Sequence, residues 1–499
     1  MKRLLRYLND YKKESVLAPL FKMLEASFEL FVPLVVAQIV DVGIKNQEAG
    51  YILKMGGLLV LLGVIGLTCS ITAQYFAAKA AVGCATGLRH ALFEHIETLS
   101  FTEMDTVGTS TLITRMTSDV NQVQNGVNLV LRLFLRSPFI VFGAMVMAFT
   151  IDVKAALVFV VTIPLLSVVV FGIMLVSIPL YKKVQAALDK VLGITRENLT
   201  GSRVIRAFNK EQDEIAQFHE DNEALTKIQL YVGKISALMN PLTYIIINGA
   251  IVVLVWVGAI RVDNGNITQG QVVALVSYMS QILVELIKLA NLIININKSI
   301  ACMNRIETVL DMESSITEHP AAETGSLTLD GAGREGKETI PAENAVVFSK
   351  VGLTYAGASE EALSDIDFTV RRGETIGIIG GTGSGKSSVV NLIPRFYDAT
   401  RGEVLVDGKN VRDYTLEELR AKVGVVLQKA VLFKGTIREN LSWGNSDATD
   451  EEMYEALETA QAREFVDAKE GGLSYEIEQG GRNLSGGQRP VSYTHLRAH

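Results

Sequence analysis

The sequence predicts two parts, an all-α domain of six membrane-spanning helices followed by a soluble α/β domain. Three observations support this prediction. Six apolar runs of about 20 residues, the length that crosses a bilayer core, fall before residue 300. The mean hydropathy is +0.28 although 20% of the 499 residues are charged, so the apolar and polar regions are separate. After residue 343 the apolar runs shorten to strand length and alternate with helical patterns.

Composition excludes several classes of protein. With 48% hydrophobic residues the chain is not disordered. Residues 1–310 carry 27 Lys and Arg against 23 Asp and Glu, whereas residues 311–499 carry 20 against 31. The acidic second part excludes a general nucleic-acid-binding surface, which needs a basic stripe. Cys69, Cys84 and Cys302 lack the spacing of a disulfide framework or metal site, so we expect them to pack as small apolar residues.

The six spans follow from the positions of the apolar runs. They are predicted at residues 16–40, 55–77, 131–148, 155–178, 238–260 and 272–294. Only the polar break 150–154 separates the third run from the fourth, which predicts a tight hairpin. The polar intervals 78–130 and 179–237 are mostly without Pro or Gly clusters, so we expect long helical extensions into water.

The distribution of Lys and Arg predicts the orientation of the spans. Residues 1–15, 77–136 and 178–237 contain five, five and nine of them, against four in the alternate loops together. Because basic residues concentrate in cytoplasmic loops, the N-terminus, both long loops and the second domain are predicted to be cytoplasmic, on a plasma-membrane protein. The first run contains Glu25 and Glu29 and no small-residue cleavage site, so we interpret it as a retained span rather than a signal peptide.

Charged residues inside the spans are candidates for function. Glu25 and Glu29 lie one helical turn apart, which predicts either a role on a pathway through the bundle or a position near the cytoplasmic interface. In the sixth span a polar stripe recurs at helical spacing, and a solvated face is favoured over one that lines a substrate site. The stripe consists of Glu285, Lys288, Asn291 and Asn295.

A phosphate-binding loop is predicted at residues 380–387, which fit G-x-x-x-x-G-K-[ST] without mismatch. The apolar run 375–379 predicts a buried strand before the loop, and residues 388–393 predict a helix after it. Glycines let consecutive backbone N–H groups converge on phosphates, and a helix N-terminus adds partial positive charge. We expect Lys386 to reach the β- and γ-phosphates and the Ser387 hydroxyl to ligate Mg²⁺. The predicted binding residues are Gly380, Gly381, Thr382, Gly383, Ser384, Gly385, Lys386, Ser387 and Ser388.

A second anion-binding motif lies about 100 residues downstream, where a serine and two glycines precede a predicted helix. Its candidate binding residues, which follow Leu484, are Ser485, Gly486, Gly487 and Gln488. Tyr355, upstream of the phosphate loop, could stack an adenine ring, although a tyrosine there also suits ordinary strand packing.

With these motifs the chain resembles the ATP-binding cassette (ABC) transporter superfamily, in particular half-transporters of the multidrug and lipid exporter type. The resemblance covers residues 1–489, as a transmembrane domain (1–310), a linker (311–343) and an α/β P-loop nucleotide-binding domain (344–489). It implies ATP and Mg²⁺ as cofactors, residues 484–488 as the signature motif and Tyr355 as the adenine-stacking aromatic. Gln428 matches the glutamine that senses Mg²⁺ and the attacking water, which implies a catalytic and metal-binding role.

The family's geometry also implies a partner chain. The phosphate loop of one chain and the signature motif of another hold the same ATP, so a dimer is expected. Residues 428–430 and 478–481 resemble bacterial half-transporters that pair with a non-identical chain, which favours a heterodimer over a homodimer. Segments 108–120 and 197–208 are similar to the two loops by which these transporters touch their ATPase domains.

The last ten residues depart from the family pattern. The family continues with a helix, a hydrophobic strand ending in the Mg²⁺-binding aspartate and catalytic glutamate, and a switch histidine. Here Pro490 would break that helix, and His495 follows with no intervening strand. We interpret residues 490–499 as a foreign or frame-shifted tail on an incomplete domain, and we expect these 499 residues alone to bind ATP weakly and hydrolyse it negligibly.

The function that the resemblance implies is an ATP-driven exporter of a small molecule, lipid or peptide. Two other classes stay open, a nucleotide-gated channel and a non-catalytic subunit that regulates an active partner. ATP-dependent flux against a gradient would separate an exporter from a channel. Co-purification of a half-transporter with a complete carboxylate strand would favour the regulatory subunit.

Overall fold

The computed structural model describes residues 2–317, 343–427 and 431–484. The chain forms two compact units. The first consists of Met1–Glu97 with Ser110–Asp311, and the second of Thr98–Thr109 with Met312–His499.

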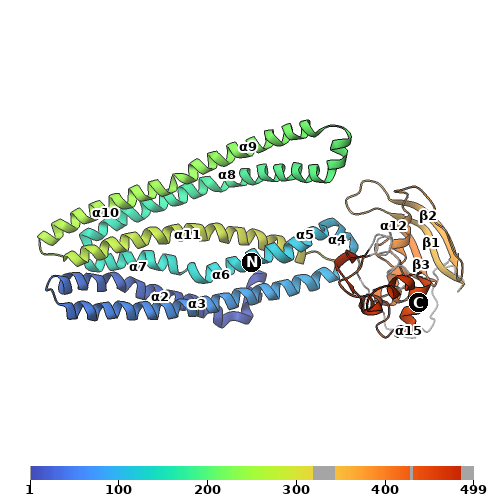
Figure 1. The fold of residues 1–499 in the computed structure, drawn as a ribbon, viewed down its shortest axis with the longest axis horizontal. Coiled ribbons are helices and arrows are strands. Elements are labelled where there is room, and N and C mark those ends of the chain that lie inside the picture. The colour runs from blue at the N-terminus through green and yellow to red at the C-terminus, as the bar shows by residue number, and fades with distance from the viewer. Residues whose placement is uncertain (1, 318–342, 428–430, 485–499) are drawn as a thin grey trace, which may run out of the picture. The chain divides into compact units, whose positions relative to one another are not determined.

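The first unit is entirely helical in its described part (Figure 1). Six segments are long and apolar enough to cross a membrane, so the six predicted spans are confirmed. Helices α3 and α8, with 50 and 55 residues, are far longer than a bilayer needs, and this confirms the predicted helical extensions. The helices are α1 (Lys2–Leu8), α2 (Lys12–Gln38), α3 (Ala49–Thr98), α5 (Thr109–Thr114), α6 (Val120–Leu133), α7 (Arg136–Ile151), α8 (Val153–Ala207), α9 (Glu211–Ala237), α10 (Met239–Asp263) and α11 (Gln269–Leu310), with π-helical turns at Ile39–Ile44 and Arg115–Asp119.

Two interruptions in the helices have local causes. Asp152 separates α7 from α8, where its carboxylate accepts a hydrogen bond from the Ala155 N–H (2.8 Å) and caps the new helix. This confirms the predicted hairpin. The third span breaks between α6 and α7 because Pro138 has no N–H and its ring clashes with the carbonyl four residues earlier. As a result Arg136 is the first residue of α7.

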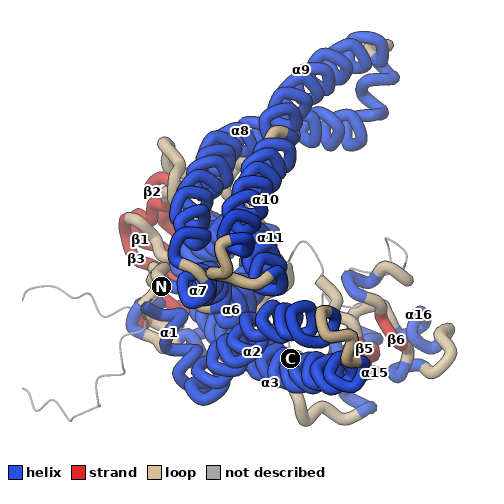
Figure 2. The backbone as a smooth tube through the Cα atoms, turned by 90° about the vertical axis from the view of Figure 1, so that its left-hand side faces the viewer, coloured by secondary structure: helices blue, strands red, loops and turns tan. Residues whose placement is uncertain are grey.

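Helix α11 is central to the core of the first unit, packing against α2, α6, α7, α8 and α10. Its fully buried Tyr278 donates a hydrogen bond to the Leu30 carbonyl of α2 (2.6 Å). Helix α8 pairs with α10 along one part of its length and with α9 along another, and α9 with the adjoining part of α8 extends away from the other helices of the unit (Figure 2). The three cysteines are buried and form no disulfide, as predicted for small apolar residues.

The second unit contains a four-stranded antiparallel sheet in the order β2-β1-β3-β4. Its core includes Phe348, which is fully buried and stacks on Phe368 of the neighbouring strand with ring centroids 4.6 Å apart. Val389 and Leu392 of α12 belong to the same core. The elements are β1 (Asn344–Leu353), β2 (Leu363–Arg371), β3 (Arg401–Val406), β4 (Lys409–Asn410), α12 (Lys386–Leu392) and α13 (Leu416–Lys422).

A smaller cluster of helices has its own core in the second unit. Helices α14 and α15 each begin with a capping box, in which a threonine and the glutamate three residues later satisfy each other's backbone N–H groups. The elements of this cluster are β5 (Gly435–Thr436), α14 (Ile437–Leu441), α15 (Asp450–Thr459), α16 (Arg463–Asp467) and β6 (Glu476–Ile477).

The buried strand predicted at residues 375–379 is wrong. The segment is irregular and exposed, and Ile379 is 96% exposed. A strand needs a neighbour to satisfy its backbone N–H and C=O groups, and among the described residues no strand pairs with this one. Its apolar residues alone therefore do not form the strand.

Candidate functional site

The phosphate loop curls between β2 and α12. Gly383 and Gly385 both have φ of +83°, in the left-handed region that side-chain-bearing residues rarely adopt. Gly385 is the residue before α12, and a Cβ there would lie 2.6 Å from Leu363 Cδ2. The predicted helix after the loop is confirmed as α12.

Lys386 folds back over the loop. Its Nζ donates to the carbonyls of Gly380 (3.0 Å) and Gly381 (2.7 Å), with Ser384 Oγ at 3.3 Å. These are neutral oxygens, and within the described ranges no carboxylate pairs with this ammonium group. Its positive charge is therefore available to a phosphate. Ser387, next in the chain, is exposed, and a Cβ added at Gly381 or Gly383 would meet nothing within 4 Å, so the loop leaves room for such a ligand.

Tyr355 lies beside the start of α12. Its hydroxyl donates to Ser388 Oγ (2.8 Å), and its ring meets Tyr397 edge-on with centroids 5.1 Å apart. The structure thus brings Tyr355 to the helix that follows the phosphate loop. Stacking of adenine on this ring stays a prediction.

A helix that sequence reasoning missed, α4 (Phe101–Val107), belongs to the second unit. The Phe101 ring lies 4.9 Å from that of Phe396, and the Tyr397 hydroxyl donates to Asp105 (2.5 Å). Burial and this hydrogen bond raise the pKa of Tyr397. A cavity of about 320 Å³ lies between α4 and the segments of Tyr355 and Tyr397.

The sequence pattern from which α4 could have been predicted is its capping box. Ser100 and Glu103 are spaced as S-x-x-E, and the Ser100 N–H donates to the Glu103 carboxylate (3.1 Å). The Ser315 N–H donates to the same carboxylate (3.2 Å). Although burial acts to raise it, hydrogen bonds from Ser100 and Ser315 hold the pKa of Glu103 below its usual value. The predicted contact segment 108–120 begins just after this helix.

Several predicted residues lie outside the described part of the chain. They are Gln428, Ser485, Gly486, Gly487 and Gln488, together with the tail 490–499 and linker residues 318–342. No group of three or more His, Cys, Asp or Glu side chains suited to a metal ion occurs among the residues that are described.

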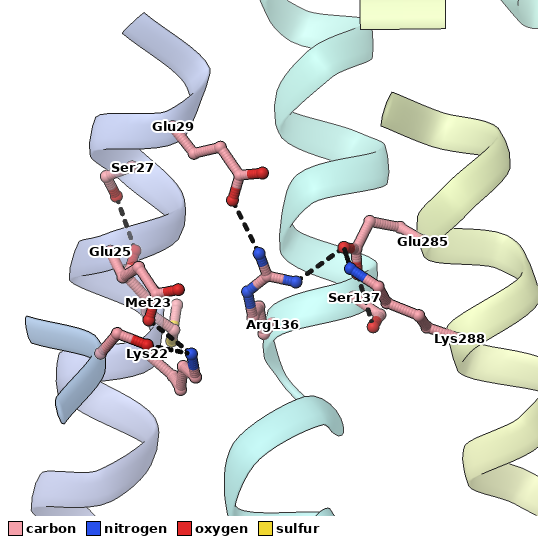
Figure 3. Close-up of polar contacts among 10 residues, drawn as sticks. Lys22, Met23, Glu25, Ser27, Glu29, Arg136, Ser137, Glu285 and Lys288 are labelled. Carbon is pink, nitrogen blue, oxygen red and sulfur yellow. Dashed lines mark hydrogen bonds and ion pairs between the residues drawn. The ribbon is translucent and has the colours of Figure 1, made fainter. Parts of the chain in front are cut away.

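A second candidate site lies inside the helical bundle (Figure 3). Arg136 joins Glu29 of α2 (2.7 Å) to Glu285 of α11 (2.6 Å). Glu285, with a side chain 3% exposed, also accepts hydrogen bonds from Ser137 (2.9 Å) and Lys288 (2.9 Å). The solvated face favoured for the sixth-span stripe is therefore wrong for Glu285, because a basic partner from another span holds this carboxylate in the interior.

The other glutamate of the first span has its own partner. Lys22, 6% exposed, donates to Glu25 (2.5 Å) and to Ser70 of α3 (3.0 Å). The two carboxylates predicted to share a role are thus separated, since Glu25 pairs within its own helix and Glu29 pairs across the bundle.

Glycine substitutions test the loop geometry. We expect Gly385→Ala to weaken nucleotide binding about tenfold, since a non-glycine residue in the left-handed region costs about 1–2 kcal/mol. Gly377→Ala is the matched control, because Gly377 precedes the loop, its φ is not positive and a Cβ there would meet nothing within 4 Å. Titration with a fluorescent ATP analogue measures both variants. Equal affinities would contradict the geometric requirement at Gly385.

Comparisons with known proteins cover both the helical part and the nucleotide-binding part of the chain. The family model described as the ABC transporter transmembrane region matches residues 15–286, and a second model, described as ABC transporter, matches residues 363–491. The chain is 34% identical to an uncharacterized ABC transporter ATP-binding protein of Mycobacterium tuberculosis, over 97% of this chain and 81% of the relative.

Two further relatives have names that state an activity. A putative multidrug export ATP-binding/permease protein of Bacillus subtilis is 31% identical, over 98% of this chain and 83% of the relative. An ATP-dependent lipid A-core flippase of Desulfotalea psychrophila is 31% identical, over 80% of this chain and 67% of the relative. With six membrane-length helices and bacterial relatives, this is a multi-pass plasma-membrane protein. The chain belongs to the ABC transporter family.

Proposed function

We propose that this chain is one half of an ATP-driven exporter that moves a small molecule, lipid or peptide across the plasma membrane. The observation that carries the proposal is the continuity of a six-span helical bundle with a phosphate loop on one chain. Importers usually keep permease and ATPase on separate chains. The names of the multidrug-export and flippase relatives support the direction of transport.

The phosphate loop residues have distinct roles in this proposal. The Lys386 ammonium holds the β- and γ-phosphates, and the loop's backbone N–H groups orient them at the start of α12. The Ser387 hydroxyl and the Gln428 amide are the ligands for Mg²⁺. Tyr355 positions the adenine ring, beside the cavity that it lines. Bound ATP with Mg²⁺ supplies the free energy of hydrolysis that transport consumes.

The working unit is a dimer, because the signature residues Ser485, Gly486, Gly487 and Gln488 act on the nucleotide of the opposite chain. A non-identical partner is favoured over a second copy. Co-expression with a differently tagged second copy tests this preference, since a heterodimer predicts that the two tags do not co-purify.

Uptake into inside-out vesicles tests the exporter function. The vesicles contain the chain with the expected carboxylate strand restored, together with its partner half-transporter. With ATP and a panel of labelled drugs, lipids and peptides, we expect at least one compound to accumulate against its gradient, and Lys386→Ala to abolish that accumulation. Flux that only dissipates a gradient would identify a nucleotide-gated channel and overturn the proposal.

A further inference from the structure

Arg136 is the centre of the charge cluster in the bundle, and only two of its three guanidinium nitrogens have a hydrogen-bond partner in the described chain. The residue is 7% exposed, with Nη1 bound to Glu285 and Nη2 bound to Glu29. Its Nε is buried and has no hydrogen-bond partner in the described chain. A guanidinium group presents its donors in a planar fork suited to carboxylates and phosphates, and here one donor of that fork is unused.

The two carboxylates that bind Arg136 differ in how firmly they are held. Glu285 is almost fully buried and has three donors, from Arg136, Ser137 and Lys288. The side chain of Glu29 is 40% exposed, and Arg136 is the partner that the described structure shows for it. Figure 3 shows the Glu29 side chain reaching across from α2 to the guanidinium group, on the side away from Glu285. Glu29 is therefore the partner that can leave.

The charge balance indicates what can replace Glu29. Arg136 and Lys288 carry two positive charges, and Glu285 supplies one negative charge. Glu29 neutralises the remaining positive charge, whereas Glu25 is paired separately with Lys22. An uncompensated charge inside a membrane bundle is costly, so the group that takes the place of Glu29 must be an anion. A cation bound at Glu29 would instead leave the cluster with a net positive charge.

We propose that Arg136 binds the acidic group of a transported amphiphile, and that Glu29 occupies this position until the ligand displaces it. This inference rests on the proposed export function and names the class of its substrate. The ligand carries a carboxylate or phosphate on an apolar body, because the cluster lies within apolar spans. Displacement lets the partly exposed Glu29 side chain turn out of the cluster while the buried Arg136–Glu285 pair stays in place.

Binding of a matched pair of probes tests the proposal. The full chain is placed in phosphatidylcholine nanodiscs without nucleotide and titrated with dansyl-undecanoic acid or with its uncharged methyl ester. Because Glu29→Gln removes the competing carboxylate, we expect about tenfold tighter binding of the acid and no change for the ester. Arg136→Gln should abolish the preference for the acid.

Two controls make the result specific. Glu25→Gln removes a carboxylate one turn away on the same helix, bound to Lys22 rather than Arg136, and should leave both affinities unchanged. Dodecyl phosphate should compete with the acid, whereas competition by inorganic phosphate alone would show a site for free anions and overturn the amphiphile assignment. Glu29→Ala provides a second test should Glu29→Gln fold poorly.

The outcome separates this inference from the function on which it rests. Unchanged or weaker acid binding in both Glu29 variants, or equal binding of acid and ester by the unmodified chain, would refute the role of Arg136. Since the assay contains no ATP, probe binding that persists without ATP-driven accumulation would instead count against export alone.

Discussion

Replacing Lys386 with alanine should weaken ATP binding by roughly 30- to 150-fold, because a hydrogen bond to a charged group contributes about 2–3 kcal/mol. Within the described residues its ammonium group binds only neutral loop oxygens, at 2.7 to 3.3 Å. Removing it leaves the phosphates with backbone N–H groups alone. Titration of the purified chain with a fluorescent ATP analogue measures the loss, and repetition with Mg²⁺ omitted shows how much of the remaining affinity depends on the metal.

The matched control for this variant is Lys409→Ala. Lys409 is an exposed lysine on the edge strand β4 of the same unit, and its Nζ lies over the Tyr414 ring at 4.3 Å. The substitution removes the same charge without touching the phosphate loop, so ATP affinity should stay within about twofold, the size of an exposed charge's contribution. If both variants bound ATP equally well, the loop would not be the nucleotide site.

Replacing Glu285 with methionine should lower the free energy of unfolding by about 3 kcal/mol, because one partner of a buried ion pair is lost while the other stays buried. Arg136 is left with Glu29 alone, and Ser137 and Lys288 lose their acceptor. Thermal unfolding in detergent, monitored by size-exclusion chromatography of the protein that stays folded, measures the loss of stability. The double variant Arg136→Met/Glu285→Met should recover most of the loss, since it leaves no buried charge without its partner in this pair.

An exposed ion pair provides the comparison for Glu285. Lys210 and Asp213 lie 2.7 Å apart, and their side chains are 63% and 69% exposed. Asp213→Asn should change stability by less than about 0.5 kcal/mol, because water and salt screen such pairs. If Asp213→Asn and Glu285→Met lowered stability equally, burial would not explain the contribution of the charge cluster in the bundle.

The local pattern of the sequence was sufficient to predict the six spans, the hairpin at Asp152 and the helix after the phosphate loop. Each depends on information within a short window: apolar length, one capping side chain, or the spacing of glycines and a lysine. The loop's special backbone is likewise local, since Gly383 and Gly385 adopt a conformation that other residues rarely tolerate.

The local sequence pattern did not predict structure that depends on contacts with a distant part of the chain. Residues 375–379 are apolar enough for a strand, yet no strand pairs with them among the described residues, and the segment is exposed. Helix α4 was missed because it is short, although its capping box is visible in the sequence. Phe101 of this helix packs against Phe396, nearly 300 residues later in the chain, and neither segment by itself predicts that contact.

The six-span bundle, the phosphate loop and the charged residues within two of the spans can all be predicted from the amino-acid sequence. Three features of the charge cluster appear only when the helices are packed: Arg136 stands between Glu29 and Glu285, Glu25 belongs to a different pair, and the two partners of Arg136 differ in exposure. Periodicity assigns a residue only to a face of its own helix. The partner across the bundle depends on how separate helices pack, which depends on contacts far apart in the sequence.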